Sequence, residues 1–206
     1  MPDDQTQRTP PARRSPLASV WTPGDHGREG ADEPGVTMRQ GRDISIVRVQ
    51  YSGSNAENMD AYLADRFGVT APAPNHVAEN DGIRLLWGGP KHLTLVAPET
   101  TRLLDRLADL TARTGGAAVD QSHGHTILRI EGPKARDLLS KGTGIDLHPN
   151  VFKPDHVAHT ALFHHTVTID RRVGTSSYDV HMMRGFAQDL FEHLTAHAAD
   201  YGYRLA

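Results

Sequence analysis

From position 44 onward, apolar and polar residues alternate in patterns typical of strands and helices. The run 44–51 is rich in β-branched residues and predicts a strand. Residues 56–67 predict a helix that Asn55 can cap and Gly68 can close. The apolar residues of this helix share one face: Met59, Tyr62, Leu63 and Phe67.

A hairpin, a second helix and a short strand are expected next. Residues 69–82 are polar and contain prolines, so they predict a loop. In 83–98, two apolar runs are separated by Gly-Gly-Pro-Lys, which is typical of a hairpin. Pro98 is expected to open a helix that reaches about Arg113 and ends before a strand at 117–121. Its inward residues are predicted to be Leu103, Leu104, Leu107 and Leu110.

The same order recurs in the second part of the chain. Residues 125–132 predict a strand, and Pro133 is expected to open a short helix. Residues 160–170 and 177–183 predict two strands around a turn. Residues 184–202 carry the strongest helical pattern, whose apolar stripe is Phe186, Leu190, Leu194 and Ala198.

This repeated order predicts the fold class. A strand–helix–strand–strand–helix–strand series, followed by strand–helix–strand–strand–helix, is the split βαβ pattern of ferredoxin-like units. We therefore expect an α+β domain over 43–206, built from two pseudo-repeats at 43–122 and 123–206. The sheets should be mostly antiparallel, with helices on one face of each.

Residues 1–42 have a different composition, with six prolines, five glycines and few large apolar side chains. Such a segment buries too little surface to offset its own ordering entropy. The sequence therefore predicts an extended arm that becomes ordered on a partner. Its expected interface residues are Leu17, Val20 and Trp21, because aromatic and aliphatic anchors dominate interface energies.

Composition and charge narrow the classes of function. The net charge of −3 gives no basic footprint for nucleic acid. No apolar run approaches the length of a membrane span, and the N-terminus lacks the apolar core of a signal peptide, so we expect a cytoplasmic protein. The absence of cysteine excludes disulfides, thiol catalysis and thiolate-bound zinc.

The glycine-rich run 132–149 has the residue types of a phosphate-binding loop. A P-loop, however, needs Gly-Lys-Ser/Thr at the start of a helix, and here Lys141 precedes Gly142 near a helix end. The C-terminus of a helix is the wrong end of the dipole for an anion. We therefore interpret the run as a short helix buried through Ala135, Leu138 and Leu139, with Gly142 in a left-handed conformation after it.

Other candidate chemistry is also weak. His193 and His197 have a spacing that can place two imidazoles on one ion, but no His-Glu-x-x-His motif or placed carboxylate accompanies them. Asp120, Ser122 and His123 are neighbours on one turn and lack the Gly-x-Ser-x-Gly elbow. The stretch 86–90 lacks dinucleotide-binding spacing. We therefore predict no catalytic, cofactor-binding or metal-binding residue in this chain.

Several motifs nevertheless resemble one family, the gamma subunits of bacterial heterotetrameric sarcosine oxidases. The resemblance covers nearly all of 44–206, with a further match at Ser15-Pro16-Leu17. Its most specific part includes Asp120-x-Ser122-x-Gly124, Leu128-Arg129-Ile130-x-Gly132-Pro133, Leu139-x-Lys141-Gly142 and Asp146-Leu147-His148-Pro149. Similar stretches are Leu86-Trp87-x-Gly89-Pro90, Tyr178-Asp179-Val180 and Arg184-x-Phe186-Ala187.

The resemblance implies a fold like the folate-binding domain of the glycine-cleavage T-protein. It also implies a non-catalytic subunit in a flavoenzyme complex that oxidatively demethylates sarcosine to glycine, forms peroxide and transfers the one-carbon unit to tetrahydrofolate. By this resemblance the partners are alpha, beta and delta subunits, with the main contact to alpha. FAD, FMN, NAD, tetrahydrofolate and zinc would be bound by those other subunits.

Two alternatives remain open from the sequence. The chain could serve a sibling complex that acts on another N-methyl amine, such as N-methylglutamate or dimethylglycine. It could also be an independent folate-binding, aminomethyltransferase-like protein, which would need a buried carboxylate for the pterin and a competent cleft.

Overall fold

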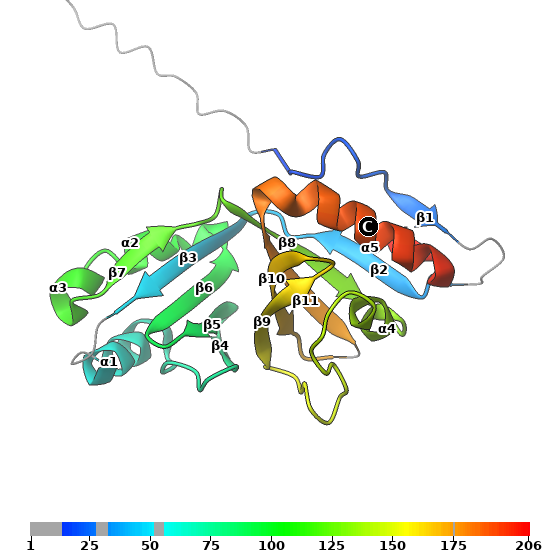
Figure 1. Cartoon of the computed structure of the whole chain (residues 1–206). Helices are drawn as coiled ribbons and strands as arrows, with labels where there is room; N and C mark the ends of the chain where they lie inside the picture. Colours follow the sequence, from blue (N-terminus) through cyan, green and yellow to red (C-terminus); the bar gives the residue numbers. More distant parts are fainter. Residues whose placement is uncertain (1–13, 28–32, 52–55, 175) are drawn as a thin grey trace, which may run out of the picture.

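The computed structural model describes residues 14–27, 33–51, 56–174 and 176–206, with the side chains of 56 and 57 left out. Two β-sheets lie side by side, one built from the first half of the chain and one from the second half with strands of the N-terminal segment (Figure 1). Asn55, the expected helix cap, lies outside the described residues.

The first half forms a five-stranded antiparallel sheet with the order β4-β5-β6-β3-β7. Its strands are β3 (Ile44–Gln50), β4 (Val77–Asn80), β5 (Ile83–Gly89), β6 (His92–Pro98) and β7 (Ala117–Asp120). Its helices are α1 (Ala56–Phe67), the 3-10 turn Glu99–Thr101, α2 (Leu103–Arg106) and α3 (Leu110–Thr114).

The second half, together with β1 and β2 from the N-terminal segment, forms a seven-stranded sheet with the order β1-β12-β2-β8-β11-β10-β9. Its strands are β1 (Gly24–His26), β2 (Val36–Gln40), β8 (His125–Glu131), β9 (Val157–Leu162), β10 (His165–Arg171), β11 (Ser177–Met183) and β12 (Tyr203–Leu205). Its helices are α4 (Ala135–Ser140) and α5 (Ala187–Ala198), with 3-10 turns at Arg184–Phe186 and Ala199–Tyr201.

The two halves repeat one topology, which confirms the predicted fold class. The order β4-β5-β6-β3-β7 in the first sheet corresponds to β9-β10-β11-β8-β12 in the second, except that β2 is inserted between β8 and β12. Among the strand pairs of the described residues, β2 and β12 are parallel and the others are antiparallel.

The inserted strand corrects the predicted domain boundary at 42. Val36 and Met38 are fully buried while Thr37 and Arg39 point to the other side, so residues 36–40 form a strand of the second sheet. The proline and glycine content of the surrounding residues obscured this short alternating pattern. Residues 36–40 are therefore part of the globular fold and not of an arm.

The expected interface residues also pack within the chain. Leu17 is 1% exposed in the core of the second half, so it offers almost no surface to a partner. Trp21 is half-buried and stacks on Phe191, with ring centroids 5.4 Å apart, and Val20 packs partly against the same core. The chain thus supplies its own docking surface for this segment.

The inner strands of both sheets point alternate side chains to two different environments. In β11, Tyr178 and Val180 point into the helix-covered core, whereas Asp179 and His181 point to the other face. In β3, Val49 belongs to the first helix-covered core. The helix-free faces of the two sheets meet, and their charged residues lie between them.

Two predicted helical faces are wrong in part. The helix expected from Pro98 is broken, because Pro98 ends β6 and Arg102 takes a left-handed conformation with φ of 52°. Helix α2 therefore starts afresh after Arg102, and its buried face differs from that of the predicted continuous helix. As a result, Leu104 is 42% exposed. Phe186 is 50% exposed because it lies in the 3-10 turn before α5 and so outside the apolar stripe.

The strands of the structure also differ in several places from the sequence predictions. Residues 160–170 do not form one strand, because Phe163 and His164 both have positive φ and make the turn between β9 and β10. Neither residue is the glycine or asparagine that marks such a turn. Strand β4 lies within the predicted loop 69–82, and β12 follows the predicted helix 184–202, where no element was expected.

Candidate functional site

A cavity of about 350 Å³ lies where the helix-free faces of the two sheets meet. Its apolar lining includes Ile44, Val96 and Ile127. Its charged and titratable lining is Arg39, Arg84, Arg129, Asp170, Arg172, Asp179 and His181. Because strands of both halves contribute, this cavity is the natural position for a ligand site in this fold.

One buried ion pair crosses between the halves at this cavity. Arg84 on β5 donates from Nε to Asp170 Oδ2 at 2.9 Å and from Nη2 to Asp170 Oδ1 at 2.6 Å. Arg84 is 3% exposed and Asp170, on β10, is 1% exposed. Burial acts to lower the pKa of Arg84, but Asp170 and Glu79 outweigh it, so the pKa lies above its usual value. Arg84 therefore stays charged.

A second pair lies within the seven-stranded sheet. Arg129 on β8 is directly opposite Asp179 on β11, and its Nε and Nη2 donate to the two carboxylate oxygens at 2.7 and 2.8 Å. Burial acts to raise the pKa of Asp179, but the hydrogen bonds and charge of Arg129 hold it below its usual value. Both buried carboxylates of the cavity are thus already engaged by arginines.

His181 lies two residues after Asp179 on β11 and also lines the cavity. Burial lowers its pKa, which favours the neutral ring, and within the described part of the chain its Nε2 has no hydrogen-bond partner. A general base needs a carboxylate or imidazole that is free to take a proton near a substrate. Asp170 and Asp179 are not free in this sense, because each is held by an arginine, and the Arg84–Asp170 pair joins the two sheets.

The run 132–149 forms the start and end of α4, as expected, but its glycines act differently. A Cβ on Gly132 would lie 2.7 Å from the carbonyl oxygen of Gly35, so this glycine lets the chain before β2 pass closely. Gly142 does not adopt the predicted left-handed conformation. It is needed because the ring of Phe163 lies 2.7 Å from where its Cβ would be.

Lys141 follows α4 but stabilises another helix, α5. Its Nζ donates to the His197 carbonyl at 3.1 Å and to Asp200 at 2.9 Å, so its charge lies at the C-terminal end of α5. This position suits a cation, because helix C-termini carry partial negative charge.

The Asp120–Ser122–His123 turn has structural contacts. The Ser122 hydroxyl accepts a hydrogen bond from the Ile46 backbone at 2.9 Å, and the Ser122 backbone donates to Asp120 Oδ1 at 2.8 Å. The side chain of His123 is exposed. These contacts hold the turn before β8 against β3.

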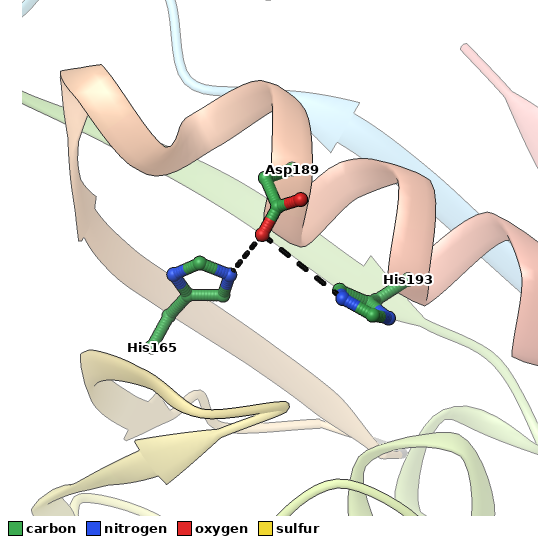
Figure 2. A group of neighbouring side chains, drawn as sticks. All are labelled: His165, Asp189 and His193. Atoms are coloured by element: carbon green, nitrogen blue, oxygen red, sulfur yellow. Dashed lines mark hydrogen bonds and ion pairs between the residues drawn. The ribbon is translucent and has the colours of Figure 1, made fainter.

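The two histidines considered from spacing do not form the pair expected of an i, i+4 metal motif. His197 stacks on Phe163, with centroids 4.8 Å apart. His193 instead lies near His165 and Asp189 (Figure 2). Sequence reasoning missed this group because His165 lies on β10, which strand β11 separates from α5 along the chain.

Comparisons with known proteins agree with this fold. The model of the sarcosine oxidase gamma subunit family (SoxG) matches residues 55–200. The chain is 29% identical over 150 residues to the sarcosine oxidase subunit gamma of Corynebacterium sp. (strain U-96), covering 73% of both proteins. It is 31% identical over 150 residues to that of Arthrobacter sp, covering 73% of this chain and 72% of the relative.

Solved structures give the same assignment. A chain of the heterotetrameric sarcosine oxidase from Corynebacterium sp. U-96 matches with a TM-score of 0.78 and 27% identity, covering 92% of this chain and 96% of that one. The glycine cleavage aminomethyltransferase T from Bartonella henselae shares the fold, with a TM-score of 0.60 at 14% identity, covering 84% of this chain and 48% of that one. Among the described residues, no helix is long and apolar enough to cross a membrane. The chain belongs to the sarcosine oxidase gamma subunit family.

Proposed function

We propose that this chain is a non-catalytic assembly subunit of a heterotetrameric, flavin-dependent sarcosine oxidase. The observation that carries this proposal is the match, over nearly the full length of both chains, to a chain of such a heterotetramer. The complex would oxidise sarcosine to glycine with formation of hydrogen peroxide and pass the one-carbon unit to tetrahydrofolate.

The cavity supports the non-catalytic part of the proposal. Asp170 and Asp179 are each held by two hydrogen bonds from an arginine, which stabilise their charged forms. Breaking such a buried pair to free a carboxylate for a substrate would leave an uncompensated arginine. The two pairs are therefore better suited to a structural role than to turnover, and Arg84–Asp170 joins the two halves.

The proposed partners are the alpha, beta and delta subunits, with the main contact to alpha. FAD, FMN, NAD, tetrahydrofolate and zinc are assigned to those subunits, and the complex to the cytoplasm. Val20 and Trp21 remain the proposed contact residues of the N-terminal segment, because they keep part of their surface exposed beside the core. Leu17 is omitted from this contact because it is buried in the chain itself.

The experiment is co-expression of tagged alpha with beta and delta, with and without this chain. We expect that omission lowers the yield of assembled complex, while sarcosine turnover per flavin in the remaining complex is unchanged. An unchanged yield with a lower turnover per flavin would contradict an assembly role. Turnover of several N-methyl amines by the full complex then separates sarcosine oxidase from a sibling complex.

The fold shared with an aminomethyltransferase makes folate binding the second candidate. Calorimetry of the isolated full-length chain with tetrahydrofolate tests it. We expect no heat of binding, because the buried carboxylates that could recognise a pterin are already paired. Saturable binding at a one-to-one ratio would favour the second candidate.

A further inference from the structure

Three side chains with metal-binding atoms meet between the β9–β10 hairpin and α5 (Figure 2). His165 is the first residue of β10 and follows the tight turn at Phe163 and His164. Asp189 and His193 are one turn apart on α5 and present their side chains on the same side of it. The potential ligand atoms of the three residues all lie within 4.8 Å of one another.

Their spacing is close to that of a metal centre. His165 Nε2 is 2.5 Å from Asp189 Oδ2, and His193 Nε2 is 4.0 Å from the same oxygen. Ligands that bind zinc at about 2.0–2.2 Å in tetrahedral geometry lie roughly 3.4 Å apart. The observed distances bracket this value, and Asp189, whose side chain is 61% exposed, has room to adjust.

Neighbouring groups hold two of the ligands in place. The His165 ring packs beside Phe186 at 5.6 Å, and the His193 ring stacks on Phe163 at 5.6 Å. Asp189 lies in the first turn of α5, where the helix dipole favours a negative charge. Phe186 is half exposed, and its contact with His165 explains why an aromatic ring lies at this surface position.

We propose that His165, Asp189 and His193 form a binding site for one divalent transition-metal ion of the zinc class. Two imidazoles and one carboxylate favour Zn²⁺ or Co²⁺ over Mg²⁺ and Ca²⁺, which prefer oxygen ligands. Water would complete the coordination, because the group is open to solvent on the Asp189 side. The site would fix the start of α5 to the β9–β10 hairpin, and it does not depend on the proposed function.

The test is titration of the untagged full-length chain with Co²⁺ and Zn²⁺, followed by visible absorption and calorimetry. The expected result is one saturable site per chain, with the absorption of tetrahedral or five-coordinate Co²⁺. Asp189→Asn and His193→Gln should each weaken binding by about tenfold or more, since even the loss of groups that only orient metal ligands has effects of this size. Mg²⁺ should not compete.

The matched control is His197→Gln, which changes a histidine one turn further along α5 that also stacks on Phe163. This variant should bind Co²⁺ as the unmodified chain does. Circular dichroism without metal checks that each variant is folded. If His165 and Asp189 form only an ion pair, the unmodified chain will bind Co²⁺ no better than the double variant His165→Gln/His193→Gln, and the proposal is wrong. Equal weakening by His197→Gln would also overturn it.

Discussion

The Arg84–Asp170 pair gives a sharp test of how the two halves are joined. Asp170→Asn keeps the shape of the side chain but removes the charge and replaces one of the two acceptor oxygens with an NH2 donor beside the arginine. Removing one partner of a buried ion pair costs about 3–5 kcal/mol. Glu79 also contacts Arg84, so we expect the lower end of this range, about 3 kcal/mol of the free energy of unfolding.

The assay is equilibrium unfolding in urea, read from tryptophan fluorescence. The chain has two tryptophans, and Trp87 lies in β5 of the first half while Trp21 packs on the second half. Trp21→Phe and Trp87→Phe backgrounds therefore report each half separately. With the pair intact, both halves should unfold at the same urea concentration. In Asp170→Asn the two midpoints should fall and separate.

Two comparisons sharpen the interpretation. The Arg204–Asp25 pair has equally good geometry, with contacts of 2.6 and 2.9 Å, but is exposed, so Asp25→Asn should change stability little. Replacing both partners, as in Arg84→Met/Asp170→Leu, should recover most of the loss, because no buried charge is left unpaired. A loss below about 1 kcal/mol for Asp170→Asn, with coincident midpoints, would refute the reasoning.

Three further predictions concern packing and titration. Leu17→Ala should lower the unfolding free energy of the isolated chain by about 2–5 kcal/mol in urea, whereas a residue that only contacts a partner would leave it unchanged. Gly142→Ala should cost about 1–3 kcal/mol by forcing the Phe163 ring to move, and Gly144→Ala, which meets open space, should cost little in the same assay. Burial and Asp109 raise the pKa of Tyr62 from 10.0 to about 12, so its phenol stabilises the fold below pH 10 and loses that effect as pH rises through about 12. Tyr51, Tyr178 and Tyr203 also have raised pKa values, so ultraviolet titration should show a late component near pH 12 that is smaller in Tyr62→Phe, and an identical curve for both proteins would contradict this.

The elements with a long apolar period could be predicted from the sequence. Helix α1 buries all four residues of its expected face. The hairpin of β5 and β6 has its turn at Pro90 and Lys91, within the predicted Gly-Gly-Pro-Lys stretch. These patterns are local, and their physical cause is burial of one face. The repeated topology followed from their order alone.

The remaining features depend on contacts between distant segments. Strand β2 is too short to stand out from its proline-rich surroundings, and its place between β8 and β12 is set by the second half of the chain. Gly142 was expected to be left-handed, yet the ring of Phe163, from another element, explains it. Neither Arg84 with Asp170 nor His165 with Asp189 has a spacing that sequence reasoning could detect.

The central claim is that this chain is a subunit of a larger oxidase. Native mass spectrometry of the complex, isolated through tagged alpha after co-expression of all four chains, tests it most directly. The account predicts one copy of this 22.5 kDa chain in each alpha–beta–delta assembly. An alpha–beta–delta assembly that forms without this chain, while the chain is recovered as a separate monomer, would contradict it.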